Sequence, residues 1–311
     1  MRLSLTLVLL LPSAAFAQTE ETVKELERQF TQKRAENATA KWIFSCEVTD
    51  GGFALAPLNP KSDAKPQPSL RATNGAVRAL KYLGFPLLKG ERERHAAFVL
   101  KCFDPKTGGF AEPGGKPDVA ITSVGVMAAV ELGVPGEKFA KALDYLKENA
   151  KTFEEVRIAA AAVEAWGVKE CPFKLDDWFK IADRHLDAIG KLKPAEGGAR
   201  ELASYAAMSL RLEWMPPLDP IRNDIVAGQR DDGGWGKKGE KASDMETTYR
   251  VMRALMLWNE KPKDVKKLRA FLESHRNKDG GCATKPGDPS SMSGVYYAAI
   301  ITKWLDELDK K

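Results

Sequence analysis

Two acidic residues at the start of a helix-like segment are the first candidates for chemistry in this sequence. They lie two positions apart in the run Asp244-Met245-Glu246-Thr247-Thr248. Carboxylates this close repel each other when both are ionised, which raises one pKa and can leave a general acid. The same pair also fits a structural role, with Asp244 as a helix N-cap and Glu246 in the first turn. The residues alone allow both interpretations.

The other reactive residue types form no recognisable catalytic motif. The sequence has no Gly-x-Ser-x-Gly elbow, no nucleotide-type phosphate loop and no His-Glu-x-x-His. No Cys-x-x-Cys pair occurs among the four cysteines, which are Cys46, Cys102, Cys171 and Cys282. We therefore expect neither a zinc ribbon nor a thioredoxin motif. We interpret these cysteines as small buried hydrophobic residues, although an even number also permits disulfides in an exported chain.

A second acidic pair leaves room for a different chemistry. Asp231 and Asp232 stand beside Trp235, a combination compatible with a polysaccharide-active site. Glycoside hydrolysis requires two carboxylates that flank the scissile bond, and residues adjacent in sequence do not by themselves supply that geometry. A secreted polysaccharide-active enzyme therefore stays an alternative.

The composition sets limits on the class of protein. Of the 311 residues, 43% are hydrophobic and 29% are charged, as in water-soluble globular chains. The formal net charge is only +5 and both signs are interspersed, so we expect no nucleic-acid partner. The length suits two ordinary domains or one large repetitive domain.

The first residues predict export. Arg2 gives a positive start, an apolar run follows from Leu3 to Leu11, and Ala15-Phe16-Ala17 fits a small-x-small cleavage site. We interpret residues 1–17 as a signal peptide and residues 18–311 as the mature protein, periplasmic or extracellular. The apolar run is too short to span a membrane, and no other stretch approaches the required length.

Glycine pairs recur along the chain and reveal its architecture. Each pair precedes an aromatic or small residue, at Gly51-Gly52-Phe53, Gly108-Gly109-Phe110, Gly197-Gly198-Ala199, Gly233-Gly234-Trp235 and Gly280-Gly281-Cys282. If one degenerate unit near Thr152 is allowed, the period is about 46 residues, which is typical of helical-pair repeats. The glycines are expected to adopt positive φ at the ends of the outer helices, and Phe53, Phe110 and Trp235 to plug the ends of helix pairs.

Two kinds of helix alternate with the glycine pairs. Charged amphipathic stretches precede each pair, and Ala-rich helices with Ser or Asp starts follow it, namely 69–83, 118–132, 244–258 and 290–305. Two layers follow from this contrast, with the charged helices outside. Because the last helix is strongly apolar, we predict a closed, all-α α/α toroid of about six helical pairs rather than an open solenoid.

These residues resemble the prenyltransferase and squalene-cyclase repeat family, and within it the β subunit of protein geranylgeranyltransferases. The resemblance is closest from Gln229 onward, through Gln-Arg-Asp-Asp-Gly-Gly-Trp-Gly, a lysine-bearing loop, the run from Asp244, and Pro286-Gly-Asp. It implies the toroid fold and, as an activity, isoprenyl transfer.

The same resemblance implies that a catalytic zinc site has been lost. Those β subunits bind zinc through an Asp, a Cys two residues later and a His in the next repeat. Asp244 matches the Asp, but Glu246 stands in the place of the Cys and Gly294 near that of the His. One carboxylate pair is a poor zinc site, so we expect no metal cofactor. For the histidines, His95, His185 and His275, we expect surface or satisfied roles rather than ligation.

Further family features point to a ligand site. The resemblance implies that Lys238 and Lys241 hold an isoprenoid diphosphate, although a solvated lysine loop is the plain alternative. Aromatic residues on the inner helices are candidates for an apolar funnel, with Tyr249 as a ligand-binding residue; the others are Tyr82, Trp166, Tyr205, Trp258 and Tyr297. The run from Asp244 is also similar to the acidic run with which squalene and class II diterpene cyclases protonate an alkene.

Taken together, the sequence predicts an exported prenyltransferase-like toroid that binds an isoprenoid or another apolar small molecule. Asp244 and Glu246 are the catalytic candidates, and Lys238, Lys241 and Tyr249 the ligand-binding ones. A non-catalytic binding or scaffold protein of the envelope is the other alternative.

Overall fold

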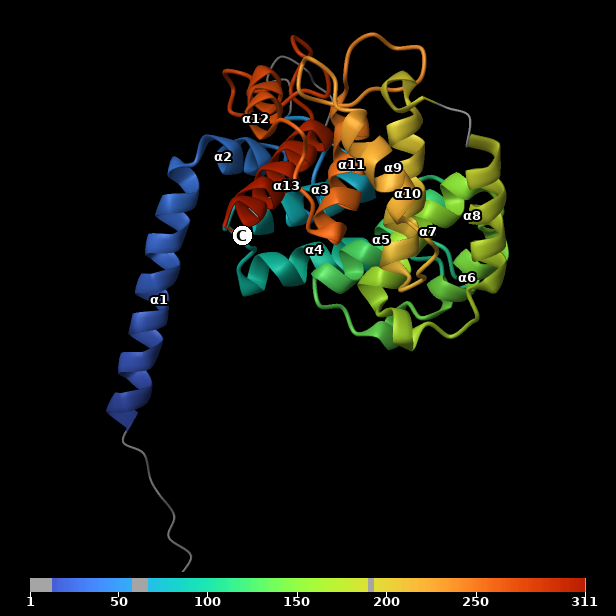
Figure 1. Ribbon diagram of the computed structural model, residues 1–311. Coiled ribbons are helices and arrows are strands. Elements are labelled where there is room, and N and C mark those ends of the chain that lie inside the picture. The colour runs from blue at the N-terminus through green and yellow to red at the C-terminus, as the bar shows by residue number, and fades with distance from the viewer. Residues whose placement is uncertain (1–12, 58–66, 190–192, 311) are drawn as a thin grey trace, which may run out of the picture. The chain divides into compact units, whose positions relative to one another are not determined.

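The computed structural model describes residues 13–57, 67–189 and 193–310, and the regular structure of this part is helical (Figure 1). It holds thirteen α-helices, three short 3-10 helices and four isolated β-bridges, with no strand among the described residues. The all-α fold class is therefore confirmed.

The chain divides into two compact units, Met1–Asn37 and Ala38–Lys311. The first contains α1 (Ser13–Glu36), whose residues from Glu21 onward are almost all exposed. The predicted domain starts at residue 18, whereas the toroidal unit starts at Ala38. Most of the predicted signal peptide lies outside the described residues.

Six helices of the second unit form an inner layer and six an outer layer. The inner helices are α3 (Leu70–Tyr82), α5 (Val119–Glu131), α7 (Phe153–Trp166), α9 (Gly198–Arg211), α11 (Met245–Trp258) and α13 (Met292–Asp309). The outer helices are α2 (Ala38–Ser45), α4 (Lys89–Lys101), α6 (Lys141–Asn149), α8 (Asp176–Ile189), α10 (Asp219–Ala227) and α12 (Val265–Ser274). Inner and outer helices alternate along the chain, which gives the six expected pairs.

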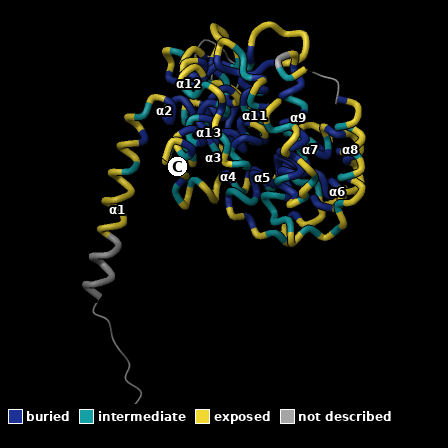
Figure 2. The backbone as a smooth tube through the Cα atoms, viewed as in Figure 1, coloured by how far each residue is buried: buried dark blue, intermediate teal, exposed yellow. Residues whose placement is uncertain are grey.

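The inner helices form a closed ring. Each contacts the next in chain order, and α13 returns to contact α3. An inner helix therefore meets two ring neighbours and an outer helix, so most of its surface is buried, as Figure 2 shows for these helices. This explains why they are rich in alanine and other apolar residues, whereas an outer helix needs only one apolar stripe.

Capping residues fix where the inner helices begin. Ser69, Asp118 and Asp244 cap α3, α5 and α11 through their side chains, as the sequence predicts. The last helix is capped by Ser291 rather than Ser290 and runs to Asp309, four residues beyond the expected end.

Four of the glycine pairs lie in the loops that follow the outer helices, not in the last helical turns as expected, whereas Gly197-Gly198 stands at the start of the inner helix α9. Gly51, Gly108, Gly233 and Gly280 do adopt positive φ. The aromatic plugs are confirmed, because Phe53, Phe110 and Trp235 are at most 1% exposed. Their backbone N–H groups donate to threonines of the following inner helices, namely Thr73, Thr122 and Thr248. The loop and the helix that follows it thus form one packed unit.

Two further features concern the whole described part of the chain. Its helices include none with the length and apolar character needed to cross a membrane. All four cysteines are free; Cys171 is partly exposed and the other three are buried, in line with their interpretation as small core residues.

Candidate anion-binding site in the central cavity

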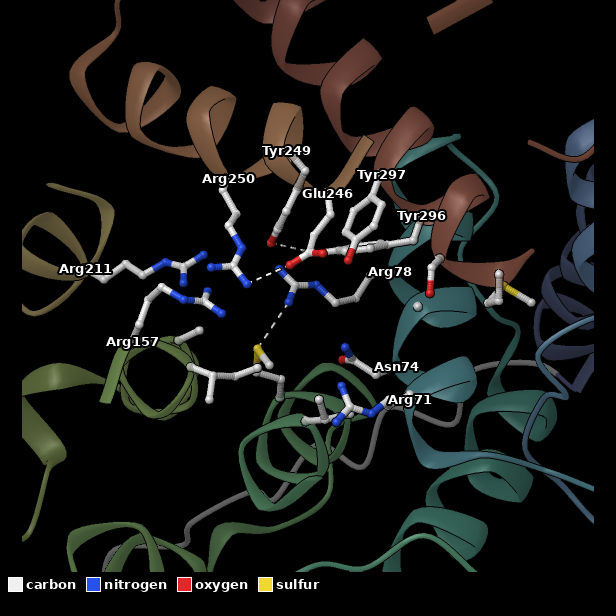
Figure 3. A pocket seen from close by; sticks show the side chains of 17 residues that line it. Arg71, Asn74, Arg78, Arg157, Arg211, Glu246, Tyr249, Arg250, Tyr296 and Tyr297 are labelled. Carbon is white, nitrogen blue, oxygen red and sulfur yellow. Dashed lines mark hydrogen bonds and ion pairs between the residues drawn. The ribbon is translucent and has the colours of Figure 1, made fainter. Parts of the chain in front are cut away.

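A cavity of about 220 Å³ lies inside the ring and receives side chains from all six inner helices (Figure 3). Its polar lining residues are Arg71, Asn74, Arg78, Arg157, Arg211, Glu246, Tyr249, Arg250, Ser293, Tyr296 and Tyr297. The remaining wall consists of Gly75, Val124, Met127, Ile158, Ala161 and Met292. The cavity therefore combines a polar, mostly cationic part with an apolar part of similar extent.

Positive charge dominates this lining. Five arginines face the cavity from four helices, whereas Glu246 is the one carboxylate among the lining residues. In Figure 3, Arg157, Arg211 and Arg250 approach one another on one side, and α3 contributes Arg71 and Arg78 from the other. Guanidinium groups bind carboxylates and phosphates through paired hydrogen bonds, so this arrangement suits an anionic ligand.

Carboxylates around the cavity hold some of these arginines in place. Arg250 donates to Glu154 of α7 and to Glu246 of its own helix, both at 2.7 Å. Arg157 donates to Glu154 at 2.9 and 3.0 Å. These ion pairs join α7 to α11 and give the arginines a fixed orientation before any ligand binds.

A second carboxylate of α7 acts in the same way. Glu164 receives both Arg253 of α11, at 2.5 and 2.7 Å, and Arg211 of α9, whose Nε lies 3.1 Å from Oε2. The Arg211 side chain is only 8% exposed and the Glu164 side chain 30%, so this ion pair is largely shielded from water on the arginine side. Helix α7 thus supplies the counter-charges for the arginines of its neighbours.

Glu246 is held in its ionised form. Burial raises the pKa of its carboxyl, but Arg250, Lys237 and Arg200 lower it by more, so the net pKa lies below the ordinary value. Its oxygens lie 2.7 Å from Arg250, 3.4 Å from Lys237 and 3.6 Å from Arg200. A carboxylate with three cationic neighbours is a poor proton donor at neutral pH.

Three tyrosines cover another side of the cavity. The hydroxyls of Tyr249 and Tyr296 are 3.2 Å apart, and the ring of Tyr249 stacks on Trp304 with a centroid separation of 5.7 Å. Burial raises the pKa of the Tyr249 phenol, but Arg211, Arg78 and further arginine charge lower it by more. The net pKa of Tyr249 therefore lies below that of a free phenol.

The predicted site residues divide into two groups. Glu246 and Tyr249 line the cavity. Asp244 instead caps α11, because its carboxylate accepts from the backbone N–H of Thr247 at 2.9 Å and from its hydroxyl at 2.8 Å. Lys238 and Lys241 are exposed on the preceding loop and are not among the lining residues.

The arginines of the cavity were not predicted from the sequence. Charged residues were expected in the outer layer, whereas the centre of the ring also holds them. A signal was available in α3, where Arg71, Asn74 and Arg78 recur at helical spacing within an Ala-rich segment. Of the aromatic candidates for an apolar funnel, only Tyr249 and Tyr297 line the cavity.

The histidines have structural roles. His95 and His275 are buried, so a surface position is wrong for both, and in each of them Nδ1 has a hydrogen-bond partner. Nε2 of His95 lies 3.1 Å from a carboxylate oxygen of Glu47, whereas the buried Nε2 of His275 has no hydrogen-bond partner in the described structure. His95 accepts from the backbone of Gly52 at 2.9 Å, and Nδ1 of His275 lies 2.7 Å from the carbonyl oxygen of Phe271. The ring of His185 stacks on Phe153 at a centroid distance of 3.7 Å.

The sequence of this toroid matches the profile of one known protein family. The profile of the prenyltransferase alpha-alpha toroid domain matches residues 18–165 and 208–311, which is most of the chain. The chain belongs to the prenyltransferase α/α-toroid family. A closer relationship to geranylgeranyltransferase β subunits stays a prediction.

Several solved structures share the fold at low sequence identity. A variant of the type II terpene cyclase MstE from Scytonema, in complex with its substrate geranylgeranyl dihydroxybenzoate, aligns with a TM-score of 0.56 at 12% identity. The alignment covers 91% of this chain and 98% of the cyclase. A protein from Actinoplanes aligns with a TM-score of 0.55 at 13% identity, over 89% of this chain and 99% of that one. A search by sequence among curated proteins finds no match.

Proposed function

We propose that this toroid binds a small anionic ligand of the isoprenoid diphosphate class in its central cavity. The observation that carries the proposal is the excess of positive charge in and around the lining: among the described residues, Arg71 and Arg78 form no ion pair with an acidic side chain. In addition, Arg211 has to share Glu164 with Arg253. Buried positive charge is costly without a counter-charge, and an anion inside the ring supplies it.

The organic part of the ligand would contact the apolar wall. Val124, Met127, Ile158, Ala161 and Met292 offer a hydrocarbon surface beside the tyrosines. A volume of about 220 Å³ is below the range of about 300–1,000 Å³ usual for drug-sized ligands, so a short isoprenoid chain suits it better than a long one. The MstE complex supports the class of ligand, because a related toroid accommodates an isoprenoid substrate.

The ionised state of Glu246 favours binding over cyclase-type acid catalysis. Alkene protonation requires a neutral acid, and the pKa of Glu246 is shifted the other way. The carboxylate of Asp244 is already used to cap α11. We therefore assign Asp244 a positioning role for the helix that carries Glu246 and Tyr249.

Of the alternatives from the sequence, a non-catalytic binding protein is compatible with the proposed ligand, whereas a polysaccharide-active enzyme and a purely structural scaffold account for the cavity less well. A glycan-cleaving site needs two opposed carboxylates, but Asp231 is fully exposed and Asp232 accepts hydrogen bonds within its own loop, from Ser243 and Gly234. A purely structural scaffold gains nothing from unneutralised arginines inside its ring.

We also propose that the protein works without zinc, because the residues do not fit the metal. Both oxygens of Asp244 accept from Thr247, and Glu246 is paired with Arg250. At Gly294 a Cβ atom would lie 2.3 Å from the carbonyl oxygen of Cys282, so no histidine fits there. Elsewhere in the described chain, no group of three or more His, Cys, Asp or Glu side chains is arranged to hold a metal.

Calorimetry with a matched ligand panel tests the proposed function. Dimethylallyl, geranyl and geranylgeranyl diphosphates are compared with geraniol, which has the chain but no charge. We expect the short diphosphates to bind, with an affinity that falls as salt increases, and geraniol to bind at least tenfold more weakly. Equal binding of geraniol and geranyl diphosphate, or no binding of any diphosphate, would contradict the proposal. A tenfold loss in the Lys238→Ala, Lys241→Ala double variant would place the anion at the lysine loop instead.

Export is proposed on the sequence of residues 1–17 alone. Mass spectrometry of the protein from its native host should find an N-terminus at or near Gln18. An intact Met1 in a cytoplasmic fraction would contradict this part of the proposal.

A further inference from the structure

One face of α3 points three polar side chains into the cavity. Arg71, Asn74 and Arg78 are three and four positions apart, a spacing that places them on one side of a helix. All three extend from α3 toward the middle of the cavity in Figure 3. Packing does not explain this polar face, because the inner layer consists mostly of alanine and other apolar residues.

The two arginines of this face differ from the others because no carboxylate neutralises them. Arg157, Arg211 and Arg250 are paired with Glu154, Glu164 and Glu246. Among the described residues, no ion pair to an acidic side chain is formed by Arg71 or Arg78. The nearby Glu112 accepts from the backbone N–H groups of Leu70 and Arg71, at 2.6 and 3.1 Å, and so caps the helix.

Arg78 has only weak partners. Its Nη1 lies 3.4 Å from the thioether sulfur of Met127, its Nη2 donates to the Tyr82 hydroxyl at 3.2 Å, and its guanidinium lies over the ring of Tyr296. Its Nε is buried and donates to no acceptor in the described structure. A thioether is a weak acceptor, so a ligand oxygen would readily replace it.

Asn74, between the two arginines, lacks a hydrogen-bond donor for its side-chain oxygen. It is 8% exposed, and its buried Oδ1 accepts no hydrogen bond from the described residues. Buried carbonyl oxygens normally have a donor, so this atom calls for one from a ligand. The face thus offers two positive charges and one acceptor.

We infer that α3 is the anion-binding face of the cavity, and that it selects a phosphoryl oxyanion which retains one O–H. Two negative charges match Arg71 and Arg78, and the remaining P–OH donates to Asn74 Oδ1. A diphosphate ester that keeps the last proton of its terminal phosphate, which it loses near pH 6, carries two negative charges and one P–OH in total. Inorganic phosphate has the same charge and one P–OH as its dianion, which is its main form at pH 8. Sulfate has the same shape and charge as this dianion but no O–H. The inference rests on the proposed function and names the part of the ligand that is recognised.

Calorimetry with inorganic phosphate, sulfate and pyrophosphate at pH 8 and equal ionic strength tests this assignment, because phosphate and sulfate then carry the same charge and differ in the O–H. The parent protein should bind phosphate at least tenfold more tightly than sulfate. Asn74→Leu should remove this preference by weakening phosphate binding to the level of sulfate. Arg78→Met, which keeps an unbranched stem, should weaken pyrophosphate binding tenfold or more. Arg71→Met should act in the same direction, and because Arg71 is exposed its replacement leaves the core intact.

A paired arginine provides the matched control. Arg157→Met should weaken pyrophosphate binding less than Arg78→Met, because Arg157 is already neutralised by Glu154. A larger effect at Arg157, or an unchanged preference for phosphate in Asn74→Leu, would overturn the assignment to α3 while leaving anion binding in place. If neither inorganic anions nor isoprenoid diphosphates bind the parent protein, the proposed function fails as well. Geranyl diphosphate that binds more tightly than pyrophosphate would identify an ester rather than the free anion as the ligand.

Discussion

Side chains from most inner helices of the ring surround Tyr249. Arg78 approaches from α3, Arg211 from α9 and Arg253 from its own helix, and all three favour its phenolate. Tyr296 and Tyr297 of α13 supply neutral neighbours. The ionisation of Tyr249 therefore reports the electrostatic potential of the cavity.

A spectrophotometric titration of the tyrosines should show one phenol that ionises before the others, and Tyr249→Phe should remove this early step. Because the folded-state pKa lies below that of a free phenol, near 10, the folded state releases its proton first. The stability contribution of Tyr249 therefore grows as the pH rises toward 10 and is lost as the pH falls below the folded pKa.

Pyrophosphate should move this early step to higher pH, since a bound anion offsets the arginines. Tyr297→Phe, a neighbouring change, should leave the step in place. An early step that survives in Tyr249→Phe would show that another tyrosine carries it.

Residue-level prediction from sequence succeeded where the cause is local. The N-cap role of Asp244 depends on hydrogen bonds within one helical turn, and the run from Asp244 to Thr248 contains all of it. The role of Arg78 depends on carboxylates that α7 supplies to other arginines but not to it. Closure of the ring decides which arginines lack a carboxylate partner. Helical spacing alone therefore could not show that Arg78 is unpaired.

At the scale of the helices, α7 holds its neighbours through Glu164. Glu164→Gln should lower the free energy of unfolding by about 1–3 kcal/mol, because Arg211 and Arg253 would lose their counter-charge in a shielded place. Chemical denaturation measures this loss. Glu307→Gln is the control: its exposed pair with Lys303 should contribute only about 0.2–0.5 kcal/mol.

The same variant links the helix contacts to the site. Pyrophosphate should raise the unfolding midpoint of Glu164→Gln more than that of the parent protein, because the freed arginines gain a counter-charge. Equal shifts would mean that Glu164 does not compete with the anion.

In the sequence of α11, Met245, Met252 and Met256 recur at helical spacing, which predicts that they share the buried side of the helix. This prediction is correct in part, because Met245 and Met252 are fully buried, whereas Met256 is only half-buried. Periodicity finds the buried side of a helix but not where along that side the neighbours end, which depends on the length of the adjacent helices.

This difference gives a test of helix packing. Met252→Ala should lower the free energy of unfolding by about 2–5 kcal/mol, as for other buried large-to-small changes. Met256→Ala should cost clearly less in the same denaturation experiment. Similar losses for both variants would show that the two side chains are equally buried in solution.

At the scale of the whole toroid, the first and last repeats close the ring through both layers. In the inner layer α13 contacts α3. In the outer layer the loop after α12 meets α2: Thr39 donates to the carbonyl of Gly280 at 2.9 Å, and Trp42 donates to Asp279 at 3.1 Å. The apolar last helix and the glycine period predicted this closure, because neither suits an exposed end.

Closure at Gly280 can be tested separately from backbone strain. Gly280 has a φ of +88°, and a Cβ atom there would lie 2.5 Å from the carbonyl oxygen of Ala38. Gly287 has a φ of +85° but no atom within 4 Å of such a Cβ. Both alanine substitutions bear the cost of positive φ, about 1–2 kcal/mol, and only Gly280→Ala must also push α2 away, which adds about 1–3 kcal/mol.

In a closed ring that strain lowers the stability of the whole toroid, so unfolding followed by circular dichroism should stay a single transition at a lower midpoint. A separate early transition confined to the last repeat would instead indicate an open solenoid, in which a terminal unit unfolds alone.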